Sequence, residues 1–168
     1  MLTACRNGSV TLWRTAGWSS TTTLSDATGL TSAALSPDGT LIATSHNDGT
    51  VVLWRITDRK RIITLHAHTG PVNTVAFSPD GRTLATAGLD GTIRLWPVRR
   101  QHSAATLTGS ANGIADLAWN PDGRVLHTAG GDQTVTSWVV RPTDAERTIC
   151  AVLARDFPNA PRPGCPRP

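Results

Sequence analysis

The sequence is poor in aromatic residues other than tryptophan: of its 168 residues none is tyrosine and two are phenylalanine, whereas six are tryptophan. Proteins that bind single-stranded nucleic acid stack its bases on exposed aromatic side chains set among basic residues. Lysine is nearly absent too, because Lys60 is the only one, and the net charge of +4 comes almost wholly from arginine. The composition therefore argues against a nucleic-acid partner.

Long apolar runs and clusters of cysteine are also missing. No stretch approaches the roughly 18 consecutive apolar residues of a membrane-spanning helix, and residues 1–8 show no basic region followed by an apolar core. Cys5, Cys150 and Cys165 lack metal-ligand spacing and are too few for a disulfide scaffold. We expect a cytoplasmic protein without a membrane segment, whose single domain is held together by its core.

An internal repeat organises most of the chain. Four tryptophans stand 41, 42 and 42 residues apart, namely Trp13, Trp54, Trp96 and Trp138. The turn sequence Ser-Pro-Asp-Gly at 36–39 returns at 78–81 and, with asparagine first, at 120–123. Two more series share this period. Six residues before the tryptophans stand Asn7, Asp48, Asp90 and Asp132, and four residues earlier stand Thr3, Thr44, Thr86 and Thr128. Four aligned series indicate one repeated supersecondary unit.

The residues between these markers have the character of short β-strands. In the third unit we predict strands over 72–77, 83–87, 92–96 and 104–107, because β-branched and apolar residues alternate with turn residues there. In the Ser-Pro-Asp-Gly turn, proline presets φ and glycine takes the left-handed conformation, which suits the hairpin between the first two strands. Four strands per unit are therefore expected.

These motifs closely resemble WD40 repeats over residues 1–141, and most specifically in the third unit, where His68 and the segment 89–96 fit the family pattern. The resemblance implies an all-β fold, a partial WD40 β-propeller of about three and a half four-stranded blades. The expected units are 1–24, 25–65, 66–107 and 108–141. Other units depart from the pattern: Ala27 and Ser110 stand where histidine is expected, and Gln133 replaces the turn glycine.

In WD40 proteins the matching side chains form a buried hydrogen-bonded tetrad that ties one blade together. Here the resemblance implies a complete structural tetrad of His68, Thr86, Asp90 and Trp96. It implies partial tetrads in the other units, made of Thr3, Asn7 and Trp13, of Thr44, Asp48 and Trp54, and of Thr128, Asp132 and Trp138. The same residue types could instead be a nucleophile, base and acid for acyl transfer at Thr86. We favour the structural interpretation, because two other units repeat the arrangement without a histidine.

Motifs for other chemistry are missing from the sequence. It has no glycine-rich phosphate loop, no His-Glu-x-x-His pair and no cluster of carboxylates. His66 and His68 stand two residues apart without a third ligand nearby. We therefore expect no enzyme activity, no metal and no cofactor.

The family resemblance also nominates a partner-binding surface. Propellers of this family bind proteins and peptides on the face where loops enter the first strands and join the second strands to the third. The matching positions here are Arg6, Thr31, Asn47, Asn73, Leu89, Ala115 and Gly131. We predict a non-enzymatic scaffold for protein–protein interaction. The alternative is the sensor domain of a larger signalling enzyme, such as a kinase, a nucleotide-binding switch or a protease-like protein.

Three and a half blades do not make a closed ring, since propellers typically have 4 to 8. The sequence resembles the C-terminal part of a longer propeller, and two copies could associate to close a ring.

The C-terminal tail differs from the repeats. A capping box at Thr143 and Glu146 and apolar residues at helical spacing predict a C-terminal helix within 142–157. Residues 158–168 are rich in proline and are expected to be disordered. The tail resembles extensions of actinobacterial WD40 proteins.

Overall fold

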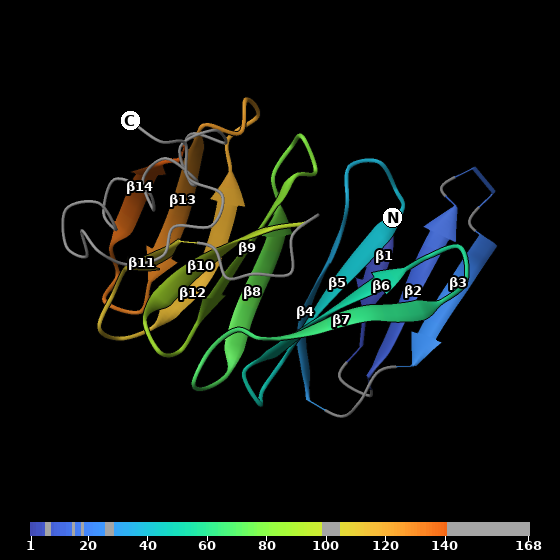
Figure 1. Cartoon of the computed structure of the whole chain (residues 1–168), viewed down its shortest axis with the longest axis horizontal. Helices are drawn as coiled ribbons and strands as arrows, with labels where there is room; N and C mark the ends of the chain where they lie inside the picture. The colour runs from blue at the N-terminus through green and yellow to red at the C-terminus, as the bar shows by residue number, and fades with distance from the viewer. Residues whose placement is uncertain (6–7, 15, 18, 26–28, 99–104, 141–168) are drawn as a thin grey trace, which may run out of the picture.

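The computed structural model describes residues 1–5, 8–14, 16–17, 19–25, 29–98 and 105–140 of the chain. Within these residues the fold is all β, with fourteen strands in four antiparallel sheets that stand beside one another like the blades of an open propeller (Figure 1). In this part of the chain there is no helix that could cross a bilayer. The predicted fold class is confirmed. The predicted helix in 142–157 and the tail 158–168 lie outside the described residues.

Each sheet is built from consecutive strands. The first contains β1 (Leu2–Ala4), β2 (Ser9–Arg14) and β3 (Ser19–Ser25). The second contains β4 (Leu30–Leu35), β5 (Leu41–His46), β6 (Thr50–Arg55) and β7 (Lys60–His66). The third contains β8 (Val72–Phe77), β9 (Thr83–Gly88), β10 (Thr92–Pro97) and β11 (Thr106–Thr108). The fourth contains β12 (Ile114–Trp119), β13 (Val125–Gly130) and β14 (Val135–Val139).

The strand pattern agrees with three and a half blades. Relative to the complete second and third sheets, the described residues include no first strand in the first sheet and no last strand in the fourth. The fourth strand of the third sheet lies slightly later than the predicted 104–107, at β11. This strand is short and its predicted segment holds few β-branched residues, so the sequence marks its bounds poorly.

The Ser-Pro-Asp-Gly turns join the first and second strands of a sheet, as predicted. In the third sheet the Ser78 hydroxyl donates to Asp80 Oδ1 at 2.6 Å and accepts the amide of Thr83 at 3.0 Å. Gly81 has φ of 69°, a left-handed conformation that glycine adopts without strain. The local sequence therefore fixes the hairpin and, with it, the register of the two strands.

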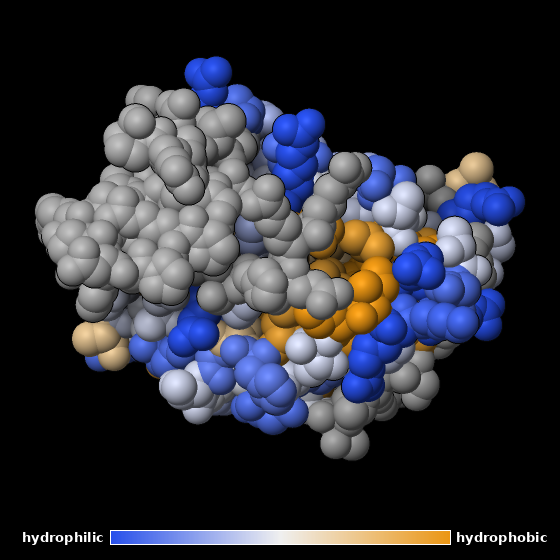
Figure 2. Space-filling model, in the orientation of Figure 1, coloured by the Kyte–Doolittle hydropathy of each residue, from blue (hydrophilic) through white to orange (hydrophobic). Residues whose placement is uncertain are grey.

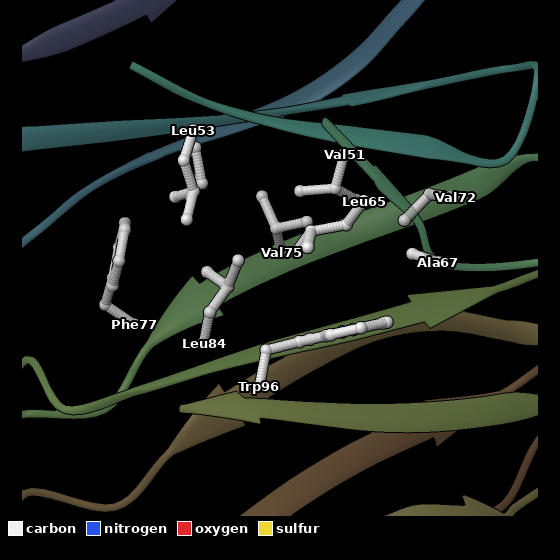
Figure 3. Close-up of a cluster of buried hydrophobic side chains, with 10 residues drawn as sticks. Val51, Leu53, Leu65, Ala67, Val72, Val75, Phe77, Leu84 and Trp96 are labelled. Carbon is white, nitrogen blue, oxygen red and sulfur yellow. The ribbon is translucent and has the colours of Figure 1, made fainter. Parts of the chain in front are cut away.

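Neighbouring sheets are held together by apolar side chains. Between the second and third sheets, side chains from both meet in one cluster (Figure 3). The buried members are Ala43, Val51, Leu53, Leu65, Ala67, Val72, Val75, Phe77, Leu84 and Trp96. In the space-filling view, apolar surface remains visible where these two sheets meet (Figure 2). Burial of the clustered side chains from water supplies the main force that stacks one sheet on the next.

Candidate functional site

The most elaborate polar cluster of the described residues lies in the third sheet, where the tetrad was predicted. The indole Nε1 of Trp96 donates to Thr86 Oγ1 at 3.1 Å, and Thr86 Oγ1 is 2.8 Å from His68 Nε2. On its other side the imidazole Nδ1 lies 2.9 Å from Asp90 Oδ1. The four side chains therefore form one continuous hydrogen-bonded chain, which runs from β10 to β9, then to the loop before β8, and ends at the turn that joins β9 and β10.

The electrostatics of this chain favour a neutral imidazole. Burial lowers the pKa of His68, although the hydrogen bond and the charge of Asp90 oppose the change. Burial alone would raise the pKa of Asp90, but hydrogen bonds from the Thr92 amide, from His68 and from the Thr92 hydroxyl outweigh it and lower that pKa to about 2. A neutral His68 with its proton on Nδ1 donates to the carboxylate and accepts from Thr86, so each group has a partner.

These two pKa shifts predict how stability depends on pH. The unfolded chain binds a proton at His68 more readily than the folded chain, so stability is expected to fall as the pH drops below about 6.5. It should fall again between about pH 4 and 2, where Asp90 is protonated first in the unfolded chain. Chemical denaturation from about pH 8 to 2 measures both steps. His68→Gln should remove the first step, and the matched change His66→Gln, at an exposed histidine, should leave it.

In the second sheet a different histidine reaches the tetrad threonine. His46 Nε2 lies 3.2 Å from Thr44 Oγ1, which also accepts Trp54 Nε1 at 3.0 Å. His46 stands 42 residues before Gly88 and is itself buried, with 3% of its surface exposed. In the third sheet Gly88 leaves room for the ring of His68, because a Cβ there would lie 3.0 Å from that ring. The second sheet thus takes its histidine from the strand instead of from the preceding loop, where the predicted position, Ala27, lies outside the described residues.

His46 is therefore expected to support the second sheet. Replacing it by alanine should lower the free energy of unfolding by about 1–3 kcal/mol, because the Thr44 hydroxyl loses a buried partner. His66→Ala is the control, since that side chain is exposed, and it should change stability by less than about 0.5 kcal/mol. Thermal unfolding of the two variants side by side checks the prediction. Equal losses would mean that the bond between His46 and Thr44 contributes nothing.

The first and fourth sheets keep the pair of tryptophan and threonine. Trp13 Nε1 donates to Thr3 Oγ1 at 2.8 Å, and Trp138 Nε1 donates to Thr128 Oγ1 at 3.0 Å. In the fourth sheet, hydrogen bonds from Thr134 and then from Ser110 lower the pKa of Asp132, so Ser110 acts on the turn aspartate in place of a histidine. Asn7 lies outside the described residues.

A further threonine follows each turn aspartate by two residues, and the sequence analysis missed it. Asp48, Asp90 and Asp132 each accept the amide and the hydroxyl of that threonine, namely Thr50, Thr92 and Thr134. The three hydroxyl bonds are 2.6, 2.8 and 2.6 Å long. The repeated pattern Asp-x-Thr was visible in the sequence, and it is the local reason why the turn aspartate has a fixed position in these three units.

Comparison with protein families agrees with this geometry. The family described as WD domain, G-beta repeat matches three segments of the chain, residues 18–55, 59–97 and 101–138. The chain belongs to the WD40 repeat family. Each matched segment begins near the outer strand of one sheet and continues through the first three strands of the next, so every WD40 repeat links two sheets. No curated protein matches the chain. Repeats of this family are generally scaffolds for protein–protein interaction.

The hydrogen bonds of the third-sheet tetrad also bear on the alternative hypothesis of acyl transfer at Thr86, which we call the hydrolytic alternative. His68 does bridge Thr86 and Asp90, as a catalytic base would. However, Thr86 is fully buried, and its oxygen already accepts the indole of Trp96. A nucleophile must lie within reach of a substrate carbonyl. The observed packing of Thr86 offers no such approach.

Two of the residues predicted to contact a partner also form hydrogen bonds between neighbouring WD40 blades. The hydroxyl of Thr31 in β4 donates to the carbonyl of Val72 in β8, and Asn73 Nδ2 in β8 donates to the carbonyl of Ile114 in β12 at 2.8 Å. The first strands of neighbouring sheets lie side by side, so these polar groups are within reach of the next blade. Ala115, one period later, is exposed and has no polar group to make such a bond.

The other predicted contact positions lie on the turns between second and third strands. The amides of Asn47, Leu89 and Gly131 donate to loop carbonyls of Gly29, Pro71 and Gly113, at 2.9, 2.9 and 2.8 Å. These bonds hold the three turns against the loops that enter the first strands. All three residues are exposed, and Leu89 has 57% of its surface in solvent. Arg6 lies outside the described residues.

Proposed function

We propose that this WD40 chain is a non-enzymatic scaffold that binds a protein or peptide partner on the face formed by the turns at Asn47, Leu89 and Gly131. The supporting observation is the exposure of Leu89, an apolar side chain, on a turn whose backbone is held by hydrogen bonds. A rigid turn presents an apolar side chain to a partner at little cost in conformational entropy. Asn47 and Gly131 supply polar and backbone groups at the equivalent turns.

The opposite side of the blades supports this choice. The third strands end there beside the Ser-Pro-Asp-Gly turns, as the bonds from Ile56 to Thr40 and from Val98 to Arg82 show. Basic and acidic side chains alternate on this side, and Arg55 pairs with Asp58 at 3.1 Å. Mixed charges of this kind form a solvated rim and do not build one strong field for a polyanion. A nucleic-acid partner is disfavoured for the same reason.

Peptide selection tests the scaffold function. A random peptide library is selected on the full chain, and the recovered peptides are measured on Leu89→Asp and on Ile62→Asp, which alters an apolar residue of β7 that is 39% exposed. We expect Leu89→Asp to weaken binding at least about tenfold and Ile62→Asp to leave it unchanged. Peptide affinity that is the same in Leu89→Asp as in the unchanged chain would contradict the proposal.

Two other experiments test the alternatives. Labelling of Thr86 by an acyl-transfer probe would establish the hydrolytic alternative. Reading the coding frame upstream of residue 1 for an effector domain tests the alternative that the chain is a sensor domain.

Self-association through the first sheet is a second proposed interaction. The described part of this sheet has no first strand, and Thr3, Thr11 and Trp13 remain half-buried on the face that no other described sheet covers. Light scattering during size exclusion should therefore show species larger than 17.8 kDa. A monodisperse monomer at high concentration would contradict it.

A further inference from the structure

The fourth sheet is the last sheet of the described chain (Figure 1), and no described element packs on its outer face. One face of this sheet packs on the third sheet through residues such as Leu117, Leu126 and Trp138. The strand pairings place the opposite side chains on the other face, which no described residue covers. They are Val125, His127, Ala129, Val135, Ser137 and Val139. Val135 and Val139 are 75% and 77% exposed.

This face differs from the faces on which the second and third sheets receive the next blade. There the central pairs are alanine with leucine, Ala43 with Leu53 and Ala85 with Leu95, and all four residues are buried. At the same place in the fourth sheet stand His127 and Ser137, which are exposed and joined by a hydrogen bond of 2.9 Å.

Two other positions of the fourth sheet also differ from the equivalent positions of the second and third sheets. Ala115 stands where Thr31 and Asn73 donate to the next sheet. Gln133 replaces the turn glycine and has φ of 67°, a left-handed conformation that is unusual for a residue with a side chain. The fourth sheet therefore lacks the side-chain donor and the apolar central pair with which the second and third sheets contact the following blade, and an element other than a blade fits this face better.

We propose that the predicted C-terminal helix, residues 144–155 of this same chain, covers the outer face of the fourth sheet. The helical spacing places Ala145, Ile149, Val152 and Leu153 on one side. That apolar side meets Val125, Val135 and Val139, which flank the polar pair of His127 and Ser137.

The geometry of the chain where it leaves the sheet supports this occupant. Val140 is 8% exposed, packs in the core between the third and fourth sheets, and donates its amide to Arg124 at 2.7 Å. The tail therefore starts beside Val139 and its partner Val125. Residues 141–143 can span at most roughly 10 Å, which is about the distance between two packed layers. A helix over 144–155 would be roughly 18 Å long, close to the roughly 17 Å of the five residues in β14.

Thiol labelling tests this docking in the full chain. Cys5, Cys150 and Cys165 are first replaced by serine, and Val135→Cys is modified with N-ethylmaleimide while the rate is followed by mass spectrometry. Thr136→Cys, exposed in the same strand but paired on the opposite face with Thr128, is the reference thiol. We expect Ile149→Asn with Leu153→Asn to speed labelling at Val135→Cys about tenfold and to leave Thr136→Cys unchanged.

The matched control places the same new residue on the other side of the predicted helix, as Arg147→Asn with Ala154→Asn, and should change neither rate. Two results would overturn the proposal: labelling at Val135→Cys that is insensitive to the tail, and protection that grows with protein concentration, which would show a second copy on this face.

A second measurement changes the sheet and observes the tail, so it does not depend on how a tail variant folds. Val135→Asn should speed amide hydrogen exchange within residues 145–155 about tenfold, whereas Thr136→Asn should not. Equal exchange rates in the two variants would also overturn the proposal.

Discussion

Replacing Trp96 by alanine is expected to lower the free energy of unfolding by about 3–5 kcal/mol, clearly more than the same change at Trp13. Trp96 is 7% exposed and belongs to the core between the second and third sheets, and its indole donates to Thr86. Trp13 makes the equivalent bond to Thr3 but is only half-buried. Denaturant unfolding of the two variants compares a complete tetrad with a partial one.

The aspartates of the turns extend this comparison. Asp90→Ala should cost about 1–3 kcal/mol, because it removes the carboxylate that accepts from the buried Nδ1 of His68 and leaves only the Thr92 hydroxyl, at 3.1 Å, beside that nitrogen. Asp132→Ala should cost less, since Asp132 is exposed and has no histidine partner. Equal losses in the third and fourth sheets would show that the histidine adds nothing to the network.

Adding a single methyl group at Gly88 is expected to have the second largest effect. A Cβ at this buried position would lie 2.9 Å from the carbonyl oxygen of Pro71 and 3.0 Å from the ring of His68. Gly88→Ala must therefore displace the ring from Thr86 and Asp90, and we expect a loss of roughly 2 kcal/mol or more from the groups left unpaired.

Gly70 provides the control for this change. A Cβ there meets no atom within 4 Å. Gly70→Ala should therefore change the melting temperature little, while Gly88→Ala should lower it by several degrees. Similar melting temperatures for the two variants would show that the loop before β8 can shift without cost.

Much of the fold could be predicted because the repeat is marked by residues with strong local preferences. The Ser-Pro-Asp-Gly turn specifies a hairpin through the backbone preferences of its proline and glycine. The runs of β-branched and apolar residues on each side of that turn correctly predicted β8 and the start of β9. The ends of strands were less predictable. β11 begins two residues after its predicted start, since a short outer strand has few residues to mark it.

The tetrad of the third sheet was predictable because all four residue types stand at the family's positions, and the structure joins them. The role of His46 was not predictable. It requires the knowledge that residue 88 lies beneath the ring of His68, a contact between a strand and a loop that the periodicity alone does not reveal.

The roles of Thr31 and Asn73 were obscured for a similar reason. Their place at the start of first strands fits a partner surface and a bond to the next blade equally well. The closeness of neighbouring first strands, which brings a backbone carbonyl within reach of each side chain, is a contact between units that the sequence does not reveal, and a partner contact at these two residues stays a prediction.

Hydrogen exchange with a selected peptide tests the central claim most directly, namely that the WD40 blades hold a rigid set of turns for a protein partner. Exchange is measured on the full chain with and without a saturating amount of the peptide. Binding on the proposed face predicts slower exchange in three segments, 46–50, 88–92 and 130–134, and no change in β7 and β11. Slower exchange confined to those outer strands, with the three turns unaffected, would contradict the proposed interaction face.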